Sequence, residues 1–299
     1  MNKTVAALWV FVFLGGTGMA FAGETGHYVC GVEGIKCASL PPPGVYFKLY
    51  NALYTSDELT DKNGDKLPLS FDVTIFAPVS RLIWVTGHKL LGGNLFMDTT
   101  IPMLYTDISI KEAGVSDSRF GLGDINIEPF GLTWHGRRYD AAASLSLWMP
   151  TGSHDPSKPA SPGKDFWTPM ITAGGTYYPD SDKTWAASIL MRYEMHSKKR
   201  SSDVTPGDDF LFEWGVSKTL AKIWDVGLAG YCSWQVEDDS GSEVTWDTDV
   251  RDRAFAVGPE VSVFLPPITT GVSMRFLWEI ETRDRPKGVM ATLTFTKVL

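Results

Sequence analysis

The chain has 299 residues, a formal net charge of −8 at pH 7 and an aromatic content of 12% that includes 11 Trp. An acidic chain is a poor candidate for binding nucleic acid, whose phosphates attract basic surfaces. After residue 22 the sequence contains no apolar stretch of about 18 residues, which excludes a transmembrane helix in that part of the chain.

Residues 1–22 have the pattern of a secretory signal peptide. A short basic start with Lys3 precedes the apolar run "TVAALWVFVFLGGTGMA", and the small residues Ala20 and Ala22 form a cleavage site. We expect cleavage after Ala22. The alternative is an N-terminal anchor helix, but the apolar run is short and rich in glycine.

Residues 23–43 are predicted to form a leader that is neither helix nor strand. Its apolar side chains follow no helical or strand period, and it ends in "LPPPG", where three prolines form a stiff extended rod. Cys30 and Cys37, separated by six residues, could form a disulfide in an oxidising compartment or remain free thiols.

From residue 44 onward the apolar residues alternate with period two, which predicts β-strands. In the first run, Val45, Phe47 and Leu49 share one face, and Tyr46 and Lys48 share the other. The same reading along the chain predicts twelve strands, at about 44–55, 69–86, 91–110, 120–134, 137–149, 167–178, 184–196, 209–220, 223–235, 253–265, 268–281 and 288–299.

The connections between these strands alternate between long polar loops and turns of two to five residues. This pattern is typical of an all-β, closed, antiparallel, up-and-down transmembrane β-barrel, with short turns in the periplasm and long loops outside the cell. Residues 44–299 are therefore predicted to form a barrel in the outer membrane of a Gram-negative cell, with both chain ends on the periplasmic side. A soluble β-sandwich is the alternative, but it leaves the alternation of loops unexplained.

The faces of the strands support the barrel. Trp224 and Trp234 lie on the same face, ten residues apart, and such a span climbs roughly 25 Å in a tilted strand, about the height of an apolar membrane band. The aromatic and aliphatic face is therefore predicted to point toward lipid; it includes Phe212, Trp224, Val272, Phe276 and Phe295. The outward parity changes at Pro129, which predicts a bulge.

Charged residues collect on the opposite parity, which would face the lumen. A charge in the lumen avoids the cost of facing lipid, and rings of such groups can select ions. They either line a selective constriction or form a salt-bridged interior that supports the wall. The candidates are Asp98, Asp124, Asn126, Glu128, Arg192, Glu194, Glu213, Glu260, Arg275, Glu279 and Glu281.

Catalytic and metal-binding patterns are absent from the sequence. The five histidines show no metal-ligand spacing, and no Ser–His pair is evident on one strand face; they are His27, His88, His135, His154 and His196. We therefore expect no enzyme activity, no metal site and no cofactor. A lipid-acting membrane enzyme remains the less favoured alternative.

Three segments resemble a bacterial family named for the MetA-pathway of phenol degradation. They are "GHYVCGVEGIKCASLPPPGVYFKLYNALYTSDEL", "GLGDINIEPFGLTWHGRRYDAAASLSLWMPTGSHD" and "FWTPMITAGGTYYPD". The resemblance implies an outer-membrane protein, a transporter associated with the breakdown of aromatic compounds. It brings no established catalytic residues.

The expected function is a passive outer-membrane channel for small hydrophobic or aromatic solutes, in contact with outer-membrane lipids and with no nucleic-acid partner. The leader is expected to enter or cap the periplasmic mouth as a plug, because a twelve-strand lumen is wider than its own side chains readily fill. A flexible periplasmic tail is the alternative for the leader. A structural or adhesive barrel with a filled lumen is the alternative for the whole protein.

Overall fold

The structure is a computed structural model that describes residues 25–299. The predicted signal peptide lies outside the described residues and stays a prediction. Within residues 25–299, no helix is long and apolar enough to cross a membrane. Two short 3₁₀ helices are present, η1 (Lys111–Ala113) and η2 (Pro266–Ile268).

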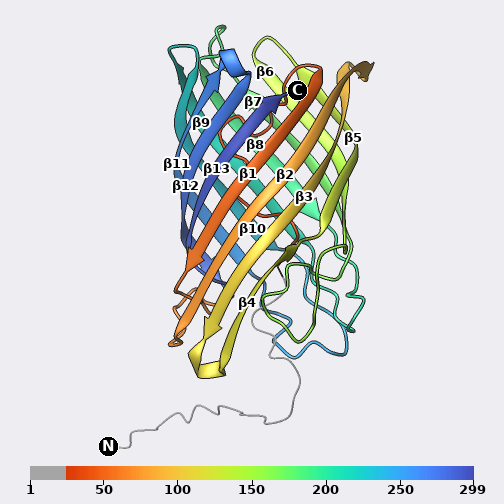
Figure 1. Ribbon diagram of the computed structural model, residues 1–299, viewed down its shortest axis with the longest axis vertical. Coiled ribbons are helices and arrows are strands. Elements are labelled where there is room, and N and C mark those ends of the chain that lie inside the picture. The colour runs from red at the N-terminus through yellow and green to blue at the C-terminus, as the bar shows by residue number, and fades with distance from the viewer. Residues whose placement is uncertain (1–24) are drawn as a thin grey trace, which may run out of the picture.

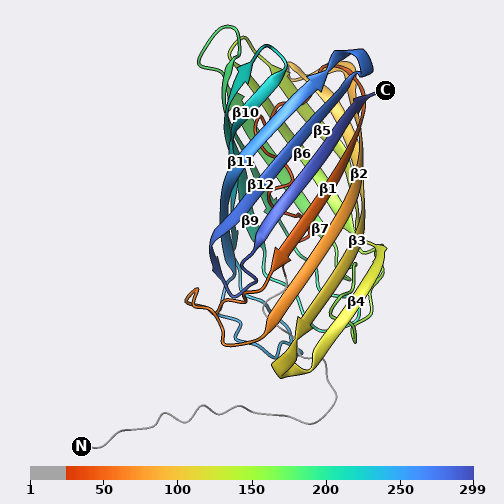
Figure 2. The ribbon, with the colours of Figure 1, turned by 60° about the vertical axis from the view of Figure 1, so that its left-hand side comes forward.

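Thirteen antiparallel strands form a single sheet that closes on itself (Figures 1 and 2). Closure follows from the pairing of β1 with both β2 and β13, of β2 with β3, and of β3 with β5, while the remaining strands pair in sequence order. The strands are β1 (Gly44–Ser56), β2 (Phe71–Leu90), β3 (Gly93–Ile110), β4 (Val115–Leu122), β5 (Ile125–His135), β6 (Tyr139–Met149), β7 (Thr168–Tyr177), β8 (Trp185–Glu194), β9 (Asp209–Leu220), β10 (Trp224–Gln235), β11 (Arg253–Leu265), β12 (Thr270–Arg283) and β13 (Val289–Val298).

The closed barrel predicted from the sequence is confirmed, with one additional strand. β4 pairs with residues 103–110 of β3, and β5 pairs with residues 94–100 of the same strand. The two strands therefore occupy one position in the wall, so that the barrel has twelve positions. The sequence predicts loop for most of β4, because its residues are polar. In the structure, β3 is long enough for its last residues to pair with β4, and the β3–β4 hairpin projects beyond the neighbouring strands (Figure 1).

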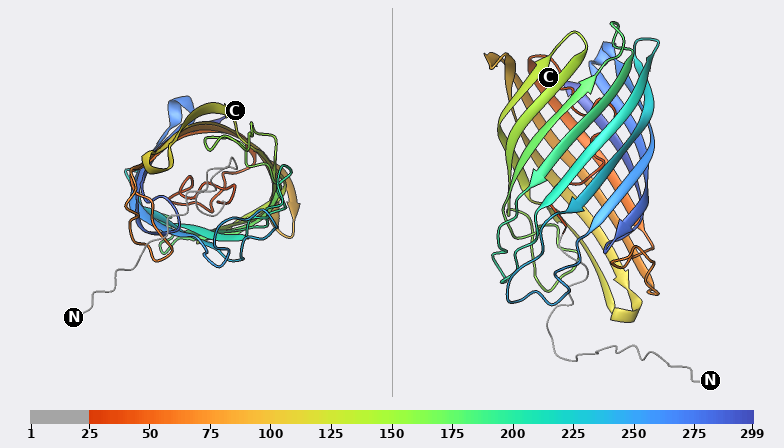
Figure 3. Two further views of the ribbon diagram at one scale, coloured as in Figure 1. Left: turned by 90° about the horizontal axis from the view of Figure 1, so that it is seen from below. Right: turned by 180° about the vertical axis from the view of Figure 1, so that it is seen from behind.

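Short turns and long loops lie at opposite ends of the barrel. β1 begins and β13 ends at the short-turn rim, where the backbone N–H of Leu299 donates to the carbonyl of Val45 at 3.0 Å. The long loops after β6, β8 and β10 gather at the other end (Figure 3). Because short turns of outer-membrane barrels face the periplasm, the long loops face outside the cell.

The outward face is apolar, as expected. Trp224 and Phe276 are 43% and 41% exposed, whereas the neighbouring Arg275 is 3% exposed. At the long-loop end, the Trp234 ring contacts Phe210, Phe212 and Phe255 with centroids 5.2–6.1 Å apart, as in an aromatic girdle. A closed wall with an apolar exterior satisfies every backbone group without water. The protein is therefore a transmembrane β-barrel of the Gram-negative outer membrane.

The predicted bulge at Pro129 is also confirmed. The β5–β6 register shifts between Ile127, opposite Leu147, and Phe130, opposite Leu145. Because a proline has no N–H to donate to a neighbouring strand, strands tolerate it at irregular positions such as bulges.

The leader, residues 25–43, lies inside the barrel along most of its length (Figure 3). Near the long loops, Lys164 Nζ donates to the carbonyl of Thr25 at 2.8 Å. At the opposite end, the Ser39 and Tyr178 hydroxyls lie 3.0 Å apart, beside a periplasmic turn. The leader therefore extends further than a cap at the periplasmic mouth, because it passes through the lumen from the loop end to Gly44, where β1 begins. The prediction that both chain ends lie on the periplasmic side is correct for Leu299 but wrong for Thr25, the first described residue, which lies near the long loops.

Candidate functional site

The centre of the lumen is organised around Glu213 of β9. Its Oε1 accepts hydrogen bonds from the backbone N–H groups of Gly31 and Glu33, both at 2.9 Å. Its Oε2 accepts from the Tyr28 hydroxyl at 2.7 Å and from Arg192 Nη1 at 2.6 Å. Four donors surround a fully buried carboxylate, which is how a protein stabilises such a charge away from water.

A second anchor is the buried ion pair between Glu260 of β11 and Arg275 of β12. Arg275 donates from Nε to Glu260 Oε2 at 2.7 Å and from Nη2 to Oε1 at 3.1 Å. The leader backbone binds both partners of the pair: Ile35 N–H donates to Glu260 Oε2 at 2.8 Å, and the Gly31 carbonyl accepts from Arg275 Nη1 at 2.5 Å. The Gly34 backbone lies so close that a Cβ there would overlap Glu260 Oε2 and Arg275 Nε.

The third anchor is Glu33, an acid on the leader itself. Its carboxylate accepts from Lys48 Nζ at 2.9 Å, from the Tyr50 hydroxyl at 2.5 Å and from Arg81 Nη1 at 3.2 Å. Arg81 also donates to Asp98 at 2.5 Å. Lys48, Tyr50 and Arg81 were not among the predicted lumen residues, although the inward parity of Lys48 and Tyr50 on β1 was a usable signal.

The loop end of the leader is held by His27. Its Nε2 lies 2.9 Å from Asp124 Oδ2, and its Nδ1 lies 2.7 Å from the Thr168 hydroxyl. The ring stacks on Trp148 with centroids 5.7 Å apart and meets the edge of Phe166 at 4.6 Å. This histidine, which the sequence places in an apparently irregular segment, is thus a buried connection between the leader and the wall.

The structure places ten of the eleven predicted lumen residues in buried positions. Glu281 is the exception, because the register shift in the β11–β12 ladder sets it opposite Phe255 and leaves it half-buried, so that its predicted inward position is wrong. Glu213, Glu260, Arg275 and Asp124 contact the leader, and Arg192 reaches it through its cation–π contact with the Tyr28 ring at 3.7 Å. The others contact the wall or one another: Asp98 and Glu128 lie beside Arg81, Glu279 accepts from the hydroxyls of Tyr54 and Tyr231, and Asn126 is paired through its backbone. Their role in selectivity stays a prediction.

The Cys30–Cys37 disulfide that the spacing allowed is not formed. All three cysteines are free in the part of the chain that the structure describes. Cys30 packs against the apolar cluster that contains Tyr231 and Leu277, whereas Cys37 Sγ lies 3.7 Å from the Glu213 carbonyl. The bonds of the leader backbone to Glu213 and Glu260 place the two thiols against different strands.

Three further side chains meet where the sequence showed no metal-binding pattern. Glu194, His196 and Asp209 each present a ligand atom, and these atoms lie within 4.8 Å of one another. Glu194 was predicted to face the lumen, but its neighbours were not identified, because Asp209 lies beyond a long loop in the sequence.

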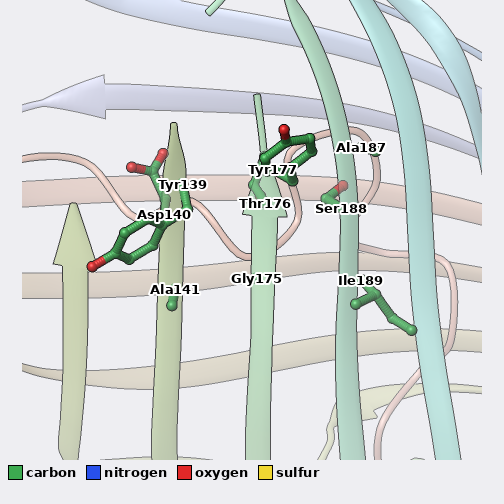
Figure 4. Close-up of a pocket in the computed structure, with 9 residues that line it drawn as sticks. All are labelled: Tyr139, Asp140, Ala141, Gly175, Thr176, Tyr177, Ala187, Ser188 and Ile189. Atoms are coloured by element: carbon green, nitrogen blue, oxygen red, sulfur yellow. The ribbon is translucent and has the colours of Figure 1, made fainter. Parts of the chain in front are cut away.

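Two depressions lie away from the lumen. One, of about 470 Å³, lies over β6, β7 and β8 between the exposed rings of Tyr139 and Tyr177 and above the small residues Ala141, Gly175 and Ala187 (Figure 4). The other, of about 490 Å³, lies among the long loops and is lined mostly by charged groups, including Asp247 and Arg251. Neither depression contains a nucleophile paired with a base.

A serine and a histidine do approach each other in the long loops. Ser201 Oγ lies 3.5 Å from His154 Nε2, and His154 Nδ1 lies 3.1 Å from the Gly163 carbonyl. Nucleophilic catalysis needs a short contact from nucleophile to base and a group that orients the base for proton transfer. This long contact gives no support to a lipid-acting enzyme.

Comparison with known proteins fits this architecture. Residues 56–295 match the family described as "Putative MetA-pathway of phenol degradation". The chain belongs to this family. A comparison with curated proteins gives no match.

Among solved structures, the chain is similar to an outer membrane channel from Pseudomonas putida F1. The two share 15% identity and a TM-score of 0.77 over 88% of this chain and 97% of the channel. The translocator domain of an autotransporter from Neisseria meningitidis is similar at 11% identity and a TM-score of 0.53, over 88% of this chain and 91% of that domain. At these identities the likeness shows the fold, which is that of an outer-membrane channel.

Proposed function

We propose that this protein is a channel for the passive uptake of small hydrophobic or aromatic solutes across the outer membrane, and that the leader is its plug. The observation that carries the proposal is the path of residues 25–43 through the lumen, bound to Glu213, Glu260 and Asp124 of the wall. A segment in this place narrows the route for any solute and excludes bulk polar molecules.

Two apolar clusters on the otherwise charged inner surface offer contacts to apolar solutes. Buried apolar residues line the wall beside the leader: Leu40 packs against Tyr46, Ile83, Val85 and Phe96 at the periplasmic end, and Cys30 packs against a cluster around Tyr231 nearer the middle. Apolar walls with a few placed polar groups are the usual lining of small-molecule sites. The family name supports a link to the catabolism of aromatic compounds, and the similar outer membrane channel from Pseudomonas putida F1 supports passage of a solute through the barrel.

The alternative is a structural barrel with a permanently filled lumen. It is favoured by the pairing of the lumen charges with one another, as in the Glu260–Arg275 ion pair. Hydrogen bonds to charged groups are each worth about 1.5–3 kcal/mol, so that the leader is held firmly. The two proposals differ in whether removal of the leader opens a path that the protein normally uses.

Deleting residues 24–40 while keeping Pro41–Pro43 tests both proposals. Purified protein in planar bilayers should show a higher single-channel conductance after the deletion than before it. In a strain that lacks the gene, the full-length protein should restore uptake of an aromatic growth substrate, and the deletion variant should also admit polar solutes of similar size. Unchanged conductance would show that the leader is not a plug, and failure of the full-length protein to restore uptake would favour the structural barrel.

A further inference from the structure

Glu194, His196 and Asp209 form a compact cluster at the loop end of the lumen, where β8 ends and β9 begins. Glu194 and Asp209 are direct cross-strand neighbours in the β8–β9 ladder. His196 lies two residues beyond Glu194. The ligand atoms of the three side chains lie within 4.8 Å of one another, and all three residues are buried.

Among residues 25–299, no Lys or Arg forms an ion pair with Glu194 or Asp209: Lys164 lies near Glu194 but donates to the Thr25 carbonyl, and the one basic group in contact with Asp209 is His196. Like charges directly opposite each other in a sheet are destabilising, and the cost is higher away from water. Glu194 is 0% exposed; its Oε1 accepts from the Tyr28 N–H at 3.0 Å, but its Oε2 has no hydrogen-bond partner among residues 25–299. A buried carboxylate oxygen without a donor is costly, and a bound cation would remove that cost.

The histidine is oriented as a ligand. His196 Nδ1 lies 2.8 Å from the Thr168 hydroxyl, and Nε2 lies 3.1 Å from Asp209 Oδ2. The edge of Phe166 packs against the ring with centroids 5.1 Å apart. When Nδ1–H donates to Thr168, the lone pair of Nε2 points at the two carboxylates. Metal-binding histidines are held in this way by a partner on the second ring nitrogen.

Gly26 of the leader closes the cluster from the lumen side. A Cβ on Gly26 would overlap Glu194 Oε2 and lie 2.5 Å from Asp209 Oδ2. The two carboxylate oxygens therefore converge on the Gly26 backbone, and the absence of a side chain there leaves room beside them.

We propose that Glu194, His196 and Asp209 bind a divalent first-row transition-metal ion such as Zn²⁺. One imidazole nitrogen and two carboxylate oxygens suit such ions, which bind at about 2.0–2.2 Å, better than Mg²⁺ or Ca²⁺, which prefer oxygen alone. The ion balances the two acids. Through the Tyr28–Glu194 hydrogen bond it also fixes the outer end of the leader against the wall.

Metal binding is measured on the full-length protein in detergent, after stripping with EDTA and dialysis. Calorimetric titration with Zn²⁺, and the visible absorption of added Co²⁺, should show about one ion per chain with nitrogen and oxygen ligands. Glu194→Gln and Asp209→Asn should each weaken binding by about tenfold or more, and Thr168→Val should do so by about 10–100-fold, since the partners that orient a ligand have effects of that size.

The matched control is Asp140→Asn at the periplasmic end. Asp140 is also buried and lies 3.1 Å from a histidine, His135, but it has no second carboxylate in a metal-binding cluster. This variant should bind Zn²⁺ like the wild type. Binding unaffected by Glu194→Gln, or equally affected by Asp140→Asn, would overturn the assignment.

A second variant separates metal binding from folding of the wall. Gly26→Ala leaves the sequence of the wall unchanged, but its Cβ would occupy the space beside Glu194 Oε2 and Asp209 Oδ2, which should reduce Zn²⁺ affinity while the barrel keeps its heat-dependent mobility on gels. If the variants of the wall acids fail to fold, wild-type stoichiometry and Gly26→Ala decide the question. A stripped wild-type protein that takes up no Zn²⁺ or Co²⁺, or a folded Gly26→Ala that binds like the wild type, would refute the site.

Discussion

Gly34→Ala should unseat the leader without touching the wall. A Cβ at this position overlaps Glu260 Oε2 and Arg275 Nε, so that the leader backbone and the two charged side-chain ends must move apart. The shift breaks the Ile35 N–H bond to Glu260 and the Arg275 bond to the Gly31 carbonyl, which measure 2.8 Å and 2.5 Å. Two bonds to charged groups at about 1.5–3 kcal/mol each amount to about 3–6 kcal/mol.

At about 1.4 kcal/mol per factor of ten, this loss raises the population of the displaced leader by about 10²- to 10⁴-fold. Planar-bilayer recordings should therefore show more frequent or longer openings, and trypsin should cleave after Lys36 faster than in the wild type. Gly87→Ala in β2, where an added Cβ would meet no atom within 4 Å, is the control. A folded Gly34→Ala protein with wild-type conductance and wild-type protection of Lys36 would refute the reasoning.

Three other predictions follow from single contacts. Phe276→Arg places a charge in the middle of the lipid-facing side of β12 and should lower the free energy of unfolding in liposomes by about 2–4 kcal/mol, measured by urea titration against Thr292→Ser on the inner face. The Asp180 carboxylate accepts from the Thr184 hydroxyl at 2.7 Å and from Trp185 N–H at 2.9 Å, which lowers the pKa of Asp180. The β7–β8 turn is therefore most stable above the ordinary aspartate pKa of about 3.9, and it loses this stabilisation as the pH falls through the lower pKa of the folded state. Asp180→Asn should speed amide exchange at Trp185 at neutral pH. Denatured, unreduced protein should react with maleimide at all three cysteines; labelling of Cys232 alone would show that Cys30 and Cys37 are joined.

The barrel could be predicted from the sequence because the membrane imposes a strict rule on each wall residue. In β12, Phe276 must be apolar and Arg275 can be charged, since one faces lipid and the other the lumen. That rule weakens where a strand leaves the membrane. Most of β4 was not predicted, because it lies at the loop end of the barrel and pairs there only with β3, where polar residues are acceptable on both faces.

The parity that revealed the inward acids could not reveal what they bind. Glu213 was predicted to face the lumen, but the donors that surround it come from a segment without any period. The same limit applies to the His196 cluster, because its members come together only when the β8–β9 register sets Glu194 opposite Asp209. Sequence patterns describe one strand at a time, whereas these sites depend on partners distant in the chain.

The leader and the wall acids supply each other's missing hydrogen-bond partners. A chain that crosses the lumen outside any sheet has backbone N–H groups with no strand partner, and leaving them unpaired and buried is costly. Four of them donate to wall carboxylates: Tyr28 to Glu194, Gly31 and Glu33 to Glu213, and Ile35 to Glu260. The acids in turn need donors because they are buried. The inward carboxylates of β8, β9 and β11 thus take the place of a neighbouring strand, which explains why an irregular segment follows a defined path through a barrel.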